Sequence, residues 1–107
     1  MIDIQLKDEP LSTEECNHLV ASAGAGGTVV FVGTVRDQTK GKKVVRLEFE
    51  AYKPMAISEM QKIAEAAQEK WSAHKIAIHH RVGVLAIGEI AVIIAVATPH
   101  RKAAFEA

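Results

Sequence analysis

Apolar and polar positions follow one another in blocks that predict strands interleaved with helices. Residues 2–6 alternate apolar and polar side chains, as a short strand with one buried face does. Residues 28–35 and 89–97 are almost wholly apolar and β-branched, which is typical of strands covered on both faces. Residues 44–52 and 75–83 alternate again. The pattern therefore predicts a sheet with two fully apolar strands at its centre.

Residues 12–22 carry the signals of a first helix. Ser12 is the expected N-cap, and Glu15 stands three residues later, where it completes a capping box. Leu11 and Cys16 occupy the positions of a hydrophobic staple. We therefore expect Cys16 to be a small core residue rather than a reactive thiol.

Residues 54–71 form the second predicted helix, which Pro54 opens. Apolar residues recur along it at intervals of three and four, so that one face packs on the sheet. A further short helix begins at the C-terminus. The residues that the periodicity places in the core are Val30, Phe49, Met60, Ile63 and Trp71.

The start of that last helix is a candidate anion site. Thr98 as N-cap and Pro99 at the first helical position put His100 and Arg101 at the second and third. Free backbone N–H groups and the positive end of the helix dipole favour an anion there. Alternatively, Arg101 pairs with Glu106 or another surface acid, and His100 is a satisfied, half-buried residue.

Arg36 ends the other apolar strand, and the ends of two neighbouring strands could converge on one cleft. We therefore expect Arg36, His100 and Arg101 to line the same anion-binding cleft. The alternative is a solvated loop arginine beside Asp37. Short hairpin-like connections next to helical crossovers favour an α+β fold in residues 1–107, a single domain with a mixed, mostly antiparallel sheet, two packed helices and a third beginning at the C-terminus.

Composition and charge narrow the classes of function. The 107 residues hold 13 Lys plus Arg and 13 Asp plus Glu, so the zero net charge draws the chain neither to nucleic acid nor to an anionic membrane. No apolar run approaches the ~20 residues of a membrane span, and the N-terminus lacks the pattern of a signal peptide. A lone cysteine can form no internal disulfide. We expect a cytoplasmic protein.

Other motifs have structural explanations. The glycines at positions 24, 26 and 27 form a turn, because they lack the Lys-Ser/Thr ending of a phosphate-binding loop. His79 and His80 point to opposite faces of a strand, so they cannot chelate one ion, and we expect no metal site. The basic stretch Lys40–Lys43 with Arg46 reads as a solvated loop, and a mobile flap over a phosphate is the functional alternative.

Four motifs in order resemble the large, catalytic subunit family of molybdopterin synthase. Residues 27–36 (GTVVFVGTVR) resemble its "FVG.VR" strand, and residues 47–55 its "L.E.Y..M" stretch. Residues 79–83 resemble its "HR.G" strand, and residues 100–107 its "HR..AFEA" helix start. The match is collinear from about residue 27 to residue 107. Residues 1–26 fit only loosely.

The resemblance implies an α/β-hammerhead fold and a sulfurtransferase activity. Enzymes of this family add two sulfurs to cyclic pyranopterin monophosphate and so form the dithiolene of molybdopterin. The sulfur arrives as a thiocarboxylate on the C-terminal Gly-Gly of a small ubiquitin-like partner, so the implied chemistry needs no cofactor and no metal. The implied assembly is a heterotetramer, with a homodimer of large subunits at its centre and a small subunit at each end.

The resemblance also implies roles for particular residues. It places substrate contacts at the end of one apolar strand and at the start of the last helix, and it makes Arg36, His100 and Arg101 the catalytic candidates. Phe31 matches a pocket residue of the first motif; the alternative is that it is a core residue. Thr34 stands where the family often has a lysine, which removes a side-chain phosphate contact but not a backbone one. The implied substrate-binding residues are Thr34, Val35, Arg36, His100 and Arg101.

One segment of the family pattern has no match. The family continues after "AFEA" to two lysines near a Trp-Lys pair, and Lys102 matches neither lysine. The resemblance therefore predicts that a chain ending at Ala107 is catalytically incomplete, with the missing lysines supplied by a longer chain. Two other classes of function stay open: a non-catalytic anion- or ligand-binding α+β dimerisation domain, and a purely structural dimerisation module.

Overall fold

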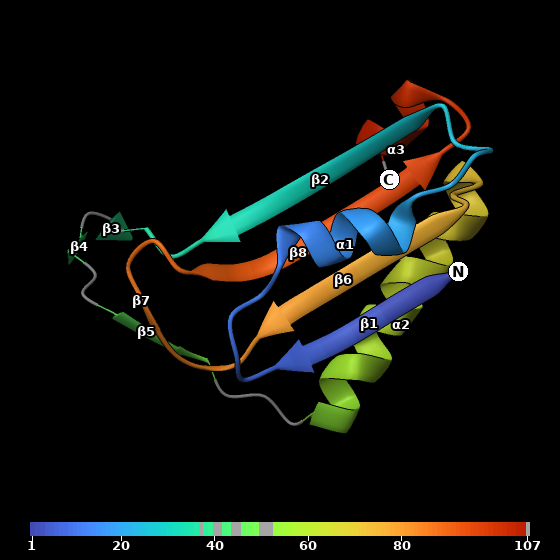
Figure 1. Cartoon of the computed structure of the whole chain (residues 1–107). Coiled ribbons are helices and arrows are strands. Elements are labelled where there is room, and N and C mark those ends of the chain that lie inside the picture. The colour runs from blue at the N-terminus through green and yellow to red at the C-terminus, as the bar shows by residue number, and fades with distance from the viewer. Residues whose placement is uncertain (37, 40–41, 44–45, 50–52, 107) are drawn as a thin grey trace.

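The computed structural model describes residues 1–36, 38–39, 42–43, 46–49 and 53–106 (Figure 1). A four-stranded sheet forms its centre, in the order β1-β6-β8-β2. β1 runs parallel to β6, and the other two pairings are antiparallel. The predicted α+β class with a mixed, mostly antiparallel sheet is confirmed. The bounds of these strands are β1 (Ile2–Lys7), β2 (Gly27–Thr34), β6 (Lys75–Arg81) and β8 (Ile90–Thr98).

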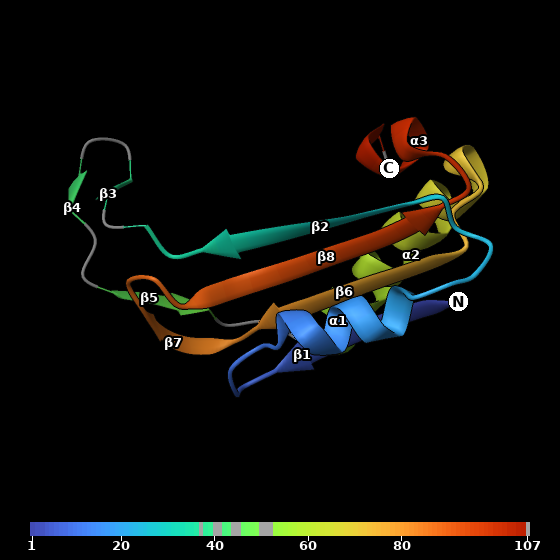
Figure 2. The ribbon, with the colours of Figure 1, turned by 45° about the horizontal axis from the view of Figure 1, so that its top comes forward.

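Helices cover both faces of the sheet. α1 (Thr13–Val20) lies over β6 and β8 on one face, while α2 (Lys53–Trp71) and α3 (Arg101–Glu106) lie on the other (Figure 2). Each face has its own apolar core: Cys16 and Val20 of α1 pack with Ala77 and Ile93. The core on the other face consists of Ala64, Ala73, Ile76, Ile78 and Val96, and we call it the second core.

None of the helices in the described ranges combines the length and apolar character that a membrane crossing requires.

The capping box predicted at the start of α1 had two hydrogen bonds, one accepted by each side chain, and the structure contains one of them. The Ser12 hydroxyl accepts a hydrogen bond from the Glu15 amide at 3.1 Å, as an N-cap does. The Glu15 carboxylate does not reach back to the cap; it pairs with Lys7 on β1, at 2.9 Å. Leu11 and Cys16 are both buried in the core, as the staple predicted. The sequence at this helix thus specifies its cap, and α1 is tied to β1 by a charge pair.

The buried face of α2 differs from the predicted one at one position. Ala64 is buried, and Met60 and Ala67 pack beside it. Ile63 is 62% exposed, so the prediction that it is buried is wrong. Residues 60, 64 and 67 form the row of α2 that faces the sheet. Ile63 lies beside this row on the helix surface, and nothing in the described structure covers its side chain. Trp71 and Val30 are half-buried, and the side chain of Phe49 is outside the described residues.

The predicted strand 75–83 ends earlier than expected. Gly83 adopts a φ of +101°, a left-handed conformation that favours glycine, and the chain turns there. Residues 83–86 then form a separate strand, β7 (Gly83–Ala86), which pairs with β5 (Arg46–Phe49). The predicted strand 44–52 is represented by β5; residues 44–45 and 50–52 are outside the described residues. The short β3 (Gln38–Thr39) pairs with β4 (Lys42–Lys43) at the same end of the molecule (Figure 1).

Candidate functional site

β2 lies at the edge of the described sheet, so the prediction that both apolar strands are central is wrong for β2. Phe31 and Thr34 lie on this strand, and Val35 and Arg36 follow it. β8 is the only strand in the described ranges that pairs with it. Val30 packs with the core under α1, so Phe31 points to the opposite face, where it is 56% exposed. The pocket role of Phe31 stays a prediction, and its exposure fits a surface residue better than a core one.

The C-terminal end of β2 presents Arg36 to solvent. The register shifts between Gly33 and Thr34, a bulge of the kind that a glycine inside a strand often marks. Val35 then turns inward and is buried, at 3% exposure. Its amide donates to the Glu89 carbonyl at 3.0 Å, and its carbonyl accepts from the Gly88 amide at 2.8 Å. Arg36 follows directly and is exposed.

His100 lies in the turn between β8 and α3. The predicted cap is wrong: Thr98 is the last residue of β8, and its hydroxyl donates to the His100 carbonyl at 2.5 Å instead of accepting from the helix. Helix α3 therefore begins at Arg101, and His100 precedes it. The Gly26 amide donates to the Pro99 carbonyl at 3.1 Å and fixes this turn against the start of β2. His100 is exposed, and the side chain of Arg101 is outside the described residues.

The two halves of the predicted site lie at opposite ends of the sheet. Gly26 bonds to Pro99 and Val35 bonds to Glu89, so the β2–β8 ladder separates Arg36 from His100. The nine residue steps from Gly26 to Val35 span about 30 Å of extended chain. Figures 1 and 2 show the end of β2 and helix α3 at opposite ends of the molecule. The prediction that Arg36, His100 and Arg101 line one cleft of a single chain is therefore wrong.

The reason for this error is strand direction. Two neighbouring strands bring their C-terminal ends together only when they are parallel, and β2 and β8 are antiparallel. The roles of these residues as substrate contacts are not affected and stay a prediction. What changes is the number of chains needed to bring them together.

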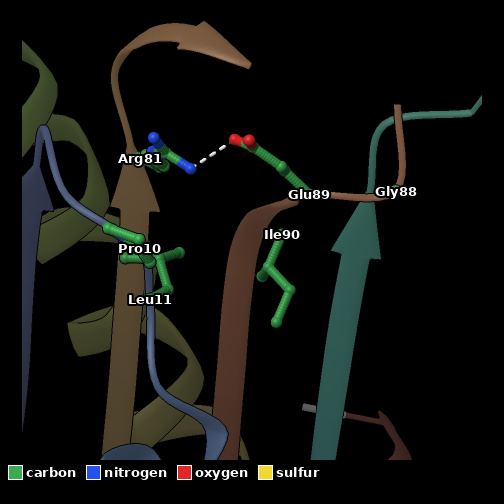
Figure 3. Close-up of a pocket in the computed structure, with 6 residues that line it drawn as sticks. All are labelled: Pro10, Leu11, Arg81, Gly88, Glu89 and Ile90. Carbon is green, nitrogen blue, oxygen red and sulfur yellow. Dashed lines mark hydrogen bonds and ion pairs between the residues drawn. The ribbon is translucent and has the colours of Figure 1, made fainter. Parts of the chain in front are cut away.

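A pocket at the Arg36 end of the sheet was not predicted from the sequence. It has a volume of about 280 Å³, and two of its lining residues, Arg81 and Glu89, form an ion pair (Figure 3). Arg81 belongs to the motif at residues 79–83 and Glu89 opens the predicted strand 89–97, but neither was given a role. The signal was an arginine near the end of an alternating strand and a glutamate at the start of an apolar strand. The lining residues are Pro10, Leu11, Arg81, Gly88, Glu89 and Ile90.

His79 is buried with a carboxylate beside it. Its Nε2 lies 2.7 Å from Oδ2 of Asp3 on the neighbouring strand β1, and its side chain is fully buried. Its ring faces α1, because His79 follows Ala77 by two residues on the same strand face. In the described ranges, no three or more His, Cys, Asp or Glu side chains gather as metal ligands would. The pair therefore links β1 to β6.

Cys16 is fully buried under α1. Burial raises the pKa of its thiol above the ordinary value, and the negative charge of Glu15 raises it further. A protonated, enclosed thiol is a poor nucleophile, and this agrees with the core role predicted for it. The side chains of the basic stretch Lys40–Lys43 are outside the described residues, so the choice between solvated loop and flap stays a prediction.

Comparisons with known proteins find the family that the motifs resemble. A family model described as MoaE protein matches residues 6–107. The molybdopterin synthase catalytic subunit of Bacillus subtilis is 50% identical over 103 residues, which is 96% of this chain and 66% of that protein. The human molybdopterin synthase catalytic subunit is 44% identical over 104 residues, 97% of this chain and 55% of that protein. The chain thus spans between about half and two thirds of the length of these relatives.

Solved structures resemble the fold as well. The crystal structure of molybdopterin synthase from Staphylococcus aureus matches with a TM-score of 0.88 at 44% identity, over 94% of this chain and 74% of that one. A complex of subunits 1 and 2 of molybdopterin-converting factor from Helicobacter pylori matches with a TM-score of 0.76, over 96% of this chain and 70% of that one. At 21% identity, the second comparison supports the fold alone.

Proposed function

The chain belongs to the MoaE protein family, and on that basis we propose that it is the large, catalytic subunit of a molybdopterin synthase, a sulfurtransferase of molybdenum cofactor biosynthesis. The observation that carries the proposal is the match over almost the whole chain to catalytic subunits of this enzyme. The substrate is cyclic pyranopterin monophosphate. The sulfur donor is a small subunit whose C-terminal Gly-Gly ends in a thiocarboxylate, and the reaction takes place in the cytoplasm.

The chemistry of this substrate suits the candidate residues. The cyclic phosphate of this substrate carries a negative charge, and guanidinium and imidazole groups supply the directional N–H donors that bind such an anion. Sulfur transfer from a thiocarboxylate passes through a tetrahedral oxyanion, which positive donors stabilise in the transition state. Arg36, His100 and Arg101 fill these roles, with Thr34 and Val35 contributing backbone contacts and Phe31 bordering the pocket.

The separation of Arg36 from His100 supports a site shared by two copies of the chain. β2 forms the edge of the described sheet, and its sequence, GTVVFVGT, has no charge and no proline to discourage pairing. Under two-fold symmetry the strand pairs with its own copy in antiparallel fashion. The midpoint between Gly26 and Val35 falls between Val30 and Phe31. A two-fold axis there places Arg36 of one copy beside the His100 turn of the other.

Mixing two inactive variants tests both the activity and the shared site. Arg36→Ala and His100→Ala each remove one half of every site in a symmetric dimer. In a mixed dimer, one site keeps both residues and the other loses both. The two variants unfolded together and refolded at equal amounts should therefore recover about a quarter of the wild-type activity.

The assay uses a chain extended to the full length of its relatives, and it measures single-turnover formation of molybdopterin from cyclic pyranopterin monophosphate and the thiocarboxylated small subunit. Each variant alone should be at least about 100-fold slower than the parent. Activity in the parent with no recovery in the mixture would contradict the shared site. Binding of phosphate with no turnover, in a chain extended to the full length of its relatives, would favour the non-catalytic dimerisation domain. A chain ending at Ala107 tests in the same assay whether the lysine segment is needed.

A further inference from the structure

The ladder between β6 and β8 ends before Arg81. Its last paired residues are His80 and Val92, and beyond them β6 turns away toward β7. The pocket with Pro10 and Ile90 in its wall occupies the space that opens there. Figure 3 shows the Arg81 guanidinium and the Glu89 carboxylate meeting across this space. The ion pair therefore links the two strands where their backbones no longer do.

Glu89 belongs to the turn that holds Val35. Its own amide donates to the Ala86 carbonyl at 3.1 Å, and Gly88 adopts a φ of +86°, which glycine allows without strain. The Glu89 carbonyl and the Gly88 amide are the two groups that bond to the backbone of Val35. The position of the turn thus determines the position of Val35.

The backbone of β2 gives Val35 little other support. The regular pairing with β8 is interrupted by the bulge at Gly33 and Thr34, directly before it. Bulges re-aim the residues that follow them, so the two hydrogen bonds to the turn decide where Val35 lies. Arg36 is the next residue, and its backbone is placed by the same contacts.

We propose that Arg81 and Glu89 form a positioning pair for Arg36. The pair holds the turn, the turn holds Val35 through two hydrogen bonds, and Val35 places the guanidinium that contacts the substrate phosphate. This inference rests on the proposed function for the role of Arg36. The carboxylate of Glu89 is 39% exposed, and a half-exposed ion pair adds little to global stability. Its loss therefore leaves the fold intact and shifts the Arg36 guanidinium relative to the substrate phosphate, which weakens the binding of substrate.

The chain contains a matched control for this pair. Lys7 and Glu15 form an ion pair with side-chain exposures of 16% and 40%, against 15% and 39% for Arg81 and Glu89. Both pairs lie toward the α1 face of the sheet. Lys7 and Glu15 join β1 to α1, and neither residue bonds to Val35 or to the turn at Gly88. Glu15→Gln therefore has the same change in charge and exposure without the proposed link.

Amide hydrogen exchange measures the structural half of the proposal without any ligand. In Glu89→Gln, the amides of Val35 and Gly88 should exchange about 3- to 10-fold faster than in the parent chain. In Glu15→Gln, both should exchange at the parent rate. Equal exchange of these amides in Glu89→Gln and the parent would overturn the proposal, whatever the activity.

Steady-state kinetics test the functional half of the proposal, in the complex of the small subunit with a chain extended to the full length of its relatives. Glu89→Gln should raise the KM for cyclic pyranopterin monophosphate about ten-fold with kcat within about two-fold, and Glu15→Gln should change neither. The exchanged pair, Arg81→Glu with Glu89→Arg, should restore most of the KM. A normal KM in Glu89→Gln despite faster exchange would overturn the positioning role. If Arg36→Ala has a normal KM, the role of Arg36 in the proposed function fails, and the exchange data alone decide whether the pair holds Val35.

Discussion

The Pro99 carbonyl oxygen lies 2.4 Å from the position that a Cβ atom on Gly26 would occupy. Nothing larger than a hydrogen fits there without moving backbone. Because Pro99 is followed by His100, this close approach fixes the turn that carries one half of the candidate site. Gly26 is thus required for space rather than for an unusual backbone conformation.

Replacing Gly26 by alanine should therefore shift this turn. We expect Gly26→Ala to lower the free energy of unfolding by about 1–3 kcal/mol, as overpacking does. Gly24→Ala is the control, since a Cβ there would meet its nearest neighbour, His74, at an ordinary 3.7 Å. Urea denaturation of both variants checks the prediction. Equal free energies of unfolding of the two variants would contradict it, because they would show that the backbone at Pro99 moves away from the new Cβ at little cost.

The contact between Asp3 and His79 predicts a clear stability effect. Asp3→Ala leaves the fully buried His79 without the carboxylate that meets its Nε2, which should lower the free energy of unfolding by about 1–3 kcal/mol. Asp8→Ala, in the exposed segment after β1, should change it by less than about 0.5 kcal/mol. Chemical denaturation measures both. An unchanged free energy of unfolding in Asp3→Ala would mean that His79 finds another hydrogen-bond partner.

The raised pKa of Cys16 predicts a loss of stability at alkaline pH. An unfolded thiol ionises near pH 8.5, whereas the folded thiol keeps its proton to higher pH. Above about pH 8.5 the unfolded chain therefore binds fewer protons than the folded chain, and stability falls as pH rises. This contribution is at most about 1.4 kcal/mol per pH unit. It should be absent in Cys16→Ala, when both proteins are unfolded in urea between pH 7 and 10; parallel curves would contradict it.

Two neighbours on α2 test the observed face of this helix. Ile63→Asp should change the free energy of unfolding by less than about 0.5 kcal/mol, because Ile63 is mostly exposed. Ala64→Asp should cost more than about 3 kcal/mol, because it buries a carboxylate in the second core. Thermal or urea unfolding of the two variants checks the contrast. A concentration-dependent loss in Ile63→Asp would instead show that a second chain covers this residue.

Local signals in the sequence specified most of the elements. Alternation and β-branched runs located the strands, and Ser12 specified the start of α1, because each of these depends on near neighbours in the chain. Ile63 was misassigned, since an apolar residue beside the buried row satisfies the same helical spacing. The end of β6 was misplaced because Gly83 permits a turn but does not require one.

The site was predicted in its residues but not in its geometry. Arg36 and His100 each follow an apolar strand, and the sequence shows this directly. Their separation depends on the direction of β2 relative to β8, which only the assembled sheet determines. The ion pair of Arg81 with Glu89 was also missed, because it depends on the folded path of the chain. The two charges are eight residues apart in sequence, and they meet only because the chain leaves the central sheet at β7 and returns to it at Glu89.

The order of strands in the central sheet has a consequence for the chain during its synthesis. β1 pairs with β6, and β2 pairs with β8, so no rung of this sheet can form before residue 75 has been made. At ordinary translation rates, β2 waits on the order of several seconds for β8 to emerge. Throughout that time a neutral, β-branched segment has no partner within its own sheet. Nascent chains are therefore most vulnerable to misassociation through β2, and chaperones that bind extended apolar segments have their clearest target there.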